Sequence, residues 1–94
     1  MYTNLFTGLI KGENTENVAT LIECEIIPLF QEQQGWEGWR LVINQDNNKL
    51  SFLTYWQSKE DAIKVSKSGV FKEQLSKMSP LMVKQSNWNS FELN

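Results

Sequence analysis

Histidine is absent from the sequence. It is the side chain that changes charge near neutral pH, and therefore the usual general base of enzymes. Its absence excludes Ser-His and Cys-His nucleophile pairs, and it removes the commonest protein ligand of haem and zinc. Any chemistry here depends on carboxylates, on Tyr, Trp or Asn side chains, or on the reactivity of the substrate itself. We therefore expect no metal and no cofactor.

Cysteine is scarce, and basic clusters and long apolar runs are missing. Cys24 is the only cysteine, so the chain forms no internal disulfide, which is typical of a protein in the reducing cytoplasm. The net charge is −2 and the Lys and Arg residues form no cluster, which argues against nucleic acid as a partner. No stretch is apolar enough to span a membrane, and the first residues do not resemble a signal peptide. The sequence thus predicts a cytoplasmic protein that binds neither membranes nor nucleic acid.

Aromatic side chains are plentiful, because the 94 residues include four Trp and five Phe. A chain of this length is expected to form one domain, residues 1–94, with a core of modest size. The rings must fill that core, an interface or a pocket.

Hydrophobic spacing and turn residues predict six main elements. In chain order they are a strand at residues 2–10, a helix at 15–34, two strands joined by a hairpin at 35–44 and 49–56, a helix broken in two at 58–82, and a last strand at 87–93. This β-α-β-β-α-β order is the ferredoxin-like plan, an α+β fold in which an antiparallel sheet carries its helices on one face.

Local signals mark the helix boundaries. Ser58, followed three residues later by Asp61, is typical of a capping box, so a helix is expected directly after the strand that ends at Trp56. Gly35 ends the long first helix. Pro28 falls inside that helix and should kink it or shift its register.

The first strand has apolar residues on both faces. Leu5 and Leu9 lie on one face, and Tyr2, Phe6 and Ile10 lie on the other. Helices in this plan cover only one face of the sheet. A second copy of the chain, packed sheet against sheet, is the simplest cover for the other face. The sequence therefore predicts a homodimer.

Three stretches carry a resemblance to a known family. They are GWEGW at 35–39, LTYWQSKEDA at 53–62 and SGVFKEQL at 68–75. In this order they resemble landmarks of the antibiotic biosynthesis monooxygenase superfamily of dimeric α/β barrels, over nearly the whole chain. The resemblance implies a homodimer joined through its sheets, as the two apolar faces also indicate.

The haem-degrading branch of that superfamily uses an Asn on the first strand, a Trp on the second helix and an iron-ligating His further on. Aligned through the same stretches, the last two places are held here by Val65 and Leu75. The Asn place falls near Leu5 or Phe6, and Asn4 is out of step with it. The resemblance therefore implies that the chain is not a haem-degrading monooxygenase.

A cofactor-independent branch oxidises phenolic polycyclic compounds and quinols. Its chemistry suits a protein without histidine, because a deprotonated, electron-rich substrate can give an electron directly to dioxygen once water is excluded. The resemblance implies a cofactor-free monooxygenase for a quinol-like or phenolic aromatic compound. The alternative is a non-catalytic dimeric barrel that binds a small hydrophobic metabolite or serves as an assembly domain.

Trp56 is the centre of the predicted ligand pocket. Strand alternation puts Phe52 and Thr54 on the same side as Trp56, and Phe71, near the start of the following helix, forms the opposite wall. Part of the Trp56 ring would then be open to a flat aromatic ligand. The alternative is that the ring is wholly enclosed in the core.

Two side chains are candidates for a catalytic role. On a regular helix Glu25 falls within the apolar stripe, where it could act as a base, although exposure is the alternative for a residue so rarely buried. Tyr55 offers a phenolic hydroxyl, but neighbours alternate on a strand, so Tyr55 and Trp56 cannot both face one pocket.

The remaining Trp residues are interpreted as structural. Trp36 and Trp39 lie three residues apart in one strand and should face opposite ways. Trp88, near the start of the last strand, is expected at an interface. Cys24 is expected to point away from the core.

Overall fold

The computed structural model describes residues 1–83 and 87–92, with residues 70, 75 and 87–92 described by their backbone alone. In chain order the elements are β1 (Tyr2–Leu9), α1 (Thr15–Leu21), the π-helix η1 (Ile22–Ile26), α2 (Ile27–Gln31), β2 (Trp36–Asn44), β3 (Lys49–Trp56), α3 (Lys59–Ser66), α4 (Gly69–Met78), the 3₁₀-helix η2 (Ser79–Leu81) and β4 (Asn87–Glu92).

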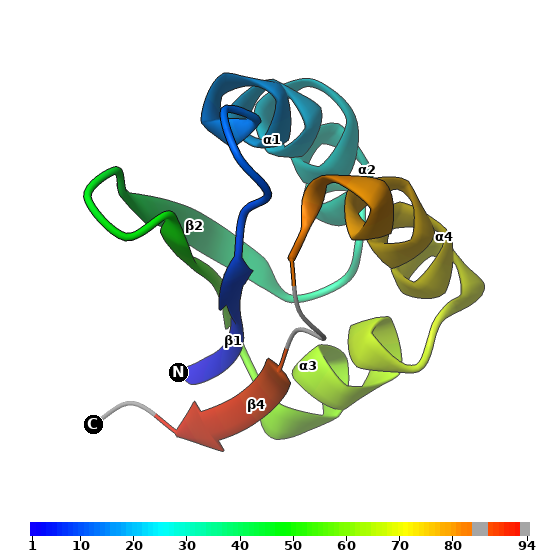
Figure 1. Cartoon of the computed structure of the whole chain (residues 1–94). Coiled ribbons are helices and arrows are strands. Elements are labelled where there is room, and N and C mark those ends of the chain that lie inside the picture. Colours follow the sequence, from blue (N-terminus) through cyan, green and yellow to red (C-terminus); the bar gives the residue numbers. More distant parts are fainter. Residues whose placement is uncertain (84–86, 93–94) are drawn as a thin grey trace.

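The strands form one antiparallel sheet in the order β2-β3-β1-β4. The helices lie on one side of this sheet (Figure 1). Phe6 of β1 pairs with Phe52 of β3, and both side chains are buried beneath the helices. The predicted ferredoxin-like fold is therefore confirmed, with its second helix broken into α3 and α4.

The junction between β3 and α3 follows the predicted capping. The Asp61 N–H donates to the Ser58 hydroxyl oxygen at 3.2 Å, and the Ser58 hydroxyl donates to Asp61 Oδ2 at 2.9 Å. These bonds satisfy a backbone donor that the first turn of a helix leaves without an intrahelical partner. Helix α3 thus begins at Lys59, three residues after β3 ends at Trp56.

The start of β2 contains a β-bulge, which the sequence pattern does not indicate. Trp36 pairs with Trp56, whereas Gly38 pairs with the residue just before Trp56, so Glu37 is an extra residue in β2. Gly38 has φ of +149°, which glycine adopts without strain. The extra residue reverses the alternation, so Trp36 and Trp39 both pack against the core. The expectation that they face opposite ways is wrong for this reason.

The first helix contains one wide turn, in η1. The N–H of Ile27 donates to the carbonyl of Ile22, five residues earlier, which is the π-helical spacing. The next residue, Pro28, has no N–H, and in a regular helix its ring would crowd the carbonyl of residue 24. The irregularity expected at Pro28 is therefore a register shift by one residue.

The π turn changes which side chains face the core. On a regular helix Ile22 would be followed there by Glu25 and Leu29. In the structure Ile26 and Phe30 are buried instead, and the Glu25 side chain is 53% exposed. The placement of Glu25 within the apolar stripe is thus wrong, and its exposed alternative holds.

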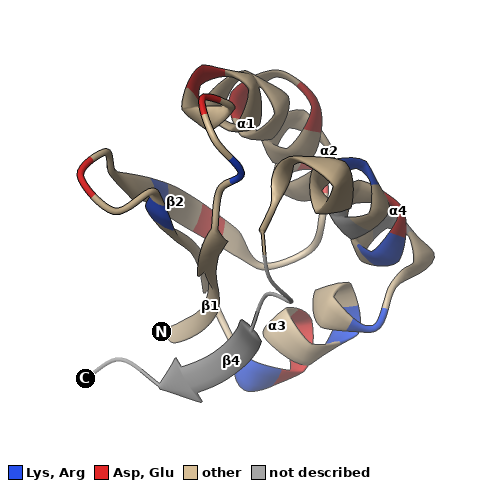
Figure 2. Ribbon diagram, viewed as in Figure 1, with Lys and Arg blue, Asp and Glu red and all other residues tan. Residues whose placement is uncertain are grey.

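Figure 2 shows where charged residues lie along the ribbon. Helices α3 and α4 carry both signs, whereas α1 and η1 carry acidic residues only. Glu25 of η1 and Lys77 of α4 form an ion pair across the two segments, with 3.7 Å between Oε1 and Nζ. Within residues 1–83 and 87–92, no helix has the length and apolar character needed to cross a membrane.

The sheet face away from the helices, here called the outer face, mixes apolar and polar side chains. Leu5 of β1 pairs with Leu53 of β3, and Leu53 pairs with Arg40 of β2. Val42, two residues further along β2, is 50% exposed. In the described part of the chain no helix covers this face (Figure 1). It is the face through which the sequence predicts a homodimer.

Candidate functional site

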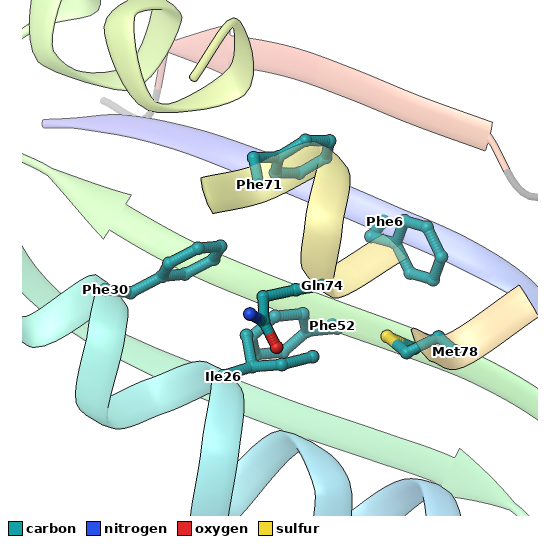
Figure 3. A pocket seen from close by; sticks show the side chains of 7 residues that line it. All are labelled: Phe6, Ile26, Phe30, Phe52, Phe71, Gln74 and Met78. Atoms are coloured by element: carbon teal, nitrogen blue, oxygen red, sulfur yellow. The ribbon is translucent and has the colours of Figure 1, made fainter. Parts of the chain in front are cut away.

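A small cavity lies between the sheet and the helices that cover it (Figure 3). Its lining comes from β1, β3, η1, α2 and α4, and consists of Phe6, Phe52, Ile26, Phe30, Phe71, Gln74 and Met78. The space between these side chains, including its opening to solvent, is about 240 Å³. Its inner part has room for about one water molecule. The interior of the site is therefore nearly filled by its own side chains in this structure.

The wall of the cavity that faces the sheet depends on residue spacing in α4 and on the π turn in η1. Phe71, Gln74 and Met78 are three and four residues apart on α4 and therefore share one helix face. The rings of Phe30 and Phe71 stack with 6.4 Å between their centroids and 10° between their planes. Ile26 completes this wall, because the extra residue of η1 turns it toward the sheet.

Gln74 is the polar exception in the lining. Its side chain is 3% exposed, and its Oε1 has no hydrogen-bond partner. A buried acceptor without a partner costs about 1–3 kcal/mol of stability. Gln74 is not among the residues predicted for the pocket, although its position three residues after Phe71 and four before Met78 places it on the apolar face of the helix.

Trp56 lies behind the cavity wall rather than on its surface. Its ring is fully buried, and its Nε1–H donates to Thr54 Oγ1 at 2.9 Å. Phe30, which does line the cavity, contacts the Trp56 ring edge to face, with 6.3 Å between centroids. Of the four residues predicted to form the pocket, Phe52 and Phe71 line the cavity, and Trp56 and Thr54 do not. The expectation of a partly open Trp56 ring is therefore wrong, because neighbouring rings enclose it.

The two predicted catalytic candidates lie outside the lining. Glu25 is exposed on η1 and pairs with Lys77, although its neighbour Ile26 lines the cavity. Tyr55 pairs with Thr3 and Gly38, and alternation with the buried Trp56 puts it on the outer face. Neither side chain contributes a polar group to the cavity.

The lining itself has no titratable side chain. Among the described residues, no group of three or more Cys, Asp or Glu is arranged to hold a metal ion. The chemistry that this site offers is therefore the binding of an apolar, aromatic molecule, with one amide to orient it.

The sequence matches no protein-family profile and no curated protein. Solved structures, by contrast, share the fold. A conserved protein from Methanosarcina mazei Go1 superposes with a TM-score of 0.82 and 17% identity, over 99% of this chain and 92% of that one. SnoaB, a cofactor-independent oxygenase from Streptomyces nogalater solved as a mutant, gives 0.79 and 15%, over 98% and 91%. A protein described as an antibiotic biosynthesis monooxygenase gives 0.78 and 13%, over 100% and 99%.

This chain shares the fold of solved structures described as antibiotic biosynthesis monooxygenases. The stretches that carry the sequence resemblance occupy defined places in this fold. GWEGW forms the bulged start of β2, and LTYWQSKEDA forms the end of β3 and the capped start of α3. SGVFKEQL forms the start of α4, which supplies Phe71 and Gln74 to the cavity.

The structure also places the positions that the sequence resemblance compares with a haem-degrading branch. Val65 is buried in the core on α3. Asn4 is also buried, and its Nδ2 donates to the carbonyl of Ala62 at 3.1 Å. The side chains of Leu75 and Trp88 lie outside the described part of the chain. Cys24 is exposed, as expected.

Proposed function

We propose that this protein is a cofactor-independent monooxygenase for a quinol-like or phenolic aromatic compound, which binds in the cavity of Figure 3. The observation that carries the proposal is the lining, in which four Phe rings converge from β1, β3, α2 and α4. A flat aromatic molecule gains from burial between such rings and from offset stacking on them. The fold shared with SnoaB, a cofactor-independent oxygenase, supports the same class of chemistry.

The proposed reaction balances without a cofactor. In an anthrone-type substrate, a ring CH₂ group becomes a carbonyl group. Dioxygen supplies one oxygen atom to the carbon, and the other oxygen atom leaves as water with the two hydrogens. The lining has no titratable side chain, so the first proton leaves to solvent through the opening of the cavity, and the ring anion then reduces dioxygen. The role of the protein is to bind and orient the ring and to exclude water.

Substrate entry requires the cavity to widen. The stacked rings of Phe30 and Phe71 belong to different helices, α2 and α4, so a small separation of these helices opens the space between them. Met78 is unbranched and readily changes rotamer, which suits a lining residue that must adapt to a ligand. The ion pair between Glu25 and Lys77 joins η1 and α4 beside this region and is too exposed to hold them firmly.

The proposal includes a homodimer that acts in the cytoplasm. The outer face, with Leu5, Leu53 and the exposed Val42, is the surface that a second copy would cover, because no helix of the described chain lies over it. The only cysteine, Cys24, is unpaired, which fits a reducing compartment.

One observation favours a second candidate function. Because the lining has no titratable side chain, the cavity is equally suited to holding a small hydrophobic metabolite without reaction. In that case the protein is a non-catalytic dimeric barrel, or an assembly domain, of the same fold.

Oxygen uptake by the purified protein with a panel of quinols and anthrones, without added cofactor, tests the proposal. We expect uptake above the uncatalysed rate with at least one substrate, and a severalfold lower rate after Phe71→Leu, which removes one wall ring. The matched control is Tyr55→Phe, on the outer face, which should keep the rate. No uptake with any member of the panel, together with binding of the same compounds, would instead support the non-catalytic barrel.

A further inference from the structure

We propose that Gln74 selects the ligand of the cavity, by accepting one hydrogen bond from a neutral aromatic hydroxyl group. This inference rests on the proposed function only in placing the ligand in the same cavity. Figure 3 shows the Gln74 amide among the rings of the lining, on the face of α4 that also carries Phe71 and Met78. Gln74 is thus a specificity-determining residue.

The free protein leaves this amide oxygen without a partner. Gln74 is 3% exposed, and its Oε1 makes no hydrogen bond in the described part of the chain. The cavity has room for about one water molecule, and a buried water needs about two to four polar partners. Every other lining residue is apolar, so such a water would find only the Gln74 amide. Oε1 is therefore a poorly solvated acceptor that gains most from a donor on a ligand.

The surroundings of Gln74 restrict the chemistry of that ligand. The lining has no Lys or Arg, so nothing in it offsets the charge of a carboxylate or phosphate ligand. The four Phe rings favour a flat aromatic body over an aliphatic one. One carbonyl oxygen offers a place for a hydroxyl donor, and further buried donors on the ligand would stay unpaired. The ligand class is therefore a neutral aromatic compound with one buried hydroxyl group.

A pair of probes with the same outline tests this assignment. Calorimetry measures the dissociation constants of 2-naphthol and 2-methylnaphthalene. These two compounds differ only in carrying a hydroxyl or a methyl group. We expect the wild-type protein to bind 2-naphthol about tenfold more tightly or better, because the methyl compound leaves Oε1 unpaired. Equal binding of the two probes, or binding of neither by the folded protein, would overturn the inference. The comparison uses the wild-type protein alone.

Matched substitutions assign the preference to one side chain. Gln74→Met keeps the length of the side chain and removes the amide, so the preference for 2-naphthol should disappear or reverse. Gln31→Met makes the same change at an exposed position on α2 and should keep the wild-type preference. Gln74→Met should also raise the melting temperature of the free protein, because a buried unpaired acceptor is removed. A preference that survives Gln74→Met would show that another group makes the selection.

The outcomes separate this inference from the proposed function. A hydroxyl preference that depends on Gln74, without oxygen uptake on any quinol or anthrone, supports the inference and contradicts catalysis. Oxygen uptake without a hydroxyl preference supports catalysis and contradicts the role of Gln74.

Discussion

Trp36 and Trp56 pack edge to face across the first pair of β2 and β3, with 5.4 Å between ring centroids and 81° between ring planes. The bulge at Gly38 makes this contact compatible with Trp39 on the same face. Phe30 contacts both rings of the pair and also lines the cavity. The two Trp rings therefore support the cavity wall from behind.

Trp56→Ala should lower the free energy of unfolding by about 3–5 kcal/mol, because it removes a fully buried ring. Thr54→Val should lower it by about 1–3 kcal/mol, because the buried indole N–H loses its acceptor. Urea denaturation measures both changes. Thr7→Val, half-buried on the outer face, is the matched control and should change the value little. A Thr54→Val variant as stable as this control would show that the hydrogen bond contributes nothing.

Gly38→Ala should destabilise the fold by about 1–3 kcal/mol, because alanine is strained at a φ of +149°. A Cβ atom there meets only Tyr55 Cδ2 at 3.8 Å, an ordinary contact, so the cost arises from the backbone. Gly69→Ala, at the start of α4 in open space, should be neutral or slightly stabilising. Thermal denaturation of the two variants makes the comparison, and equal melting temperatures would argue against the strained bulge.

Val42→Lys should shift the protein from dimer to monomer, because it puts a charge into the proposed interface on the outer face. Val83→Lys is the matched control, since Val83 is 55% exposed against 50% for Val42 and lies outside the sheet. Light scattering at micromolar concentration measures the mass. A monomeric wild-type protein, or equal effects of the two substitutions, would contradict a dimer through this face.

Glu25→Gln should leave the rate of oxygen uptake unchanged, because the carboxylate is exposed and lies outside the cavity lining. The loss of its ion pair with Lys77 should change the free energy of unfolding by less than about 1 kcal/mol. An oxygen electrode and urea denaturation provide the two measurements. A large loss of rate at unchanged stability would restore Glu25 as a candidate base.

Titration with haemin should give only a weak, broad change in the Soret band. The chain has no histidine, and Val65, at one of the three positions compared with the haem-degrading branch, is buried in the core. Absorption spectroscopy at increasing haemin concentration measures this. A sharp ligated spectrum at one haemin per chain would contradict the prediction.

Local signals predicted much of the fold. The Ser58–Asp61 cap depends on neighbouring residues, and the element order follows from spacing along the chain, so both can be read without tertiary information. The bulge at Gly38 cannot, because two residues of β2 oppose one of β3 only once the strands pair. Pro28 predicted an irregular helix. Whether that helix kinks or forms a wide π turn depends on how it packs against the sheet.

The candidate site was only partly predictable for the same reason. Phe52 and Phe71 were placed correctly against the sheet and the helices, but the closure of Trp56 depends on Trp36, which the bulge brings onto the core face. Gln74 carried a readable signal, a polar residue at an apolar helical position. That signal shows that a side chain is buried, whereas the lack of a partner for its oxygen is visible only in three dimensions.

The wide turn of η1 contains one residue more than a regular helical turn would need. This extra residue keeps the apolar faces of both α1 and α2 turned toward the sheet. A regular helix would turn both faces toward the sheet only if the chain were one residue shorter. Loss of the exposed Cys24 would thus leave both faces against the core, but in the resulting regular helix the Pro28 ring would crowd the carbonyl four residues before it. The extra residue of the π turn therefore keeps both faces on the core and leaves room for Pro28 in the same helix.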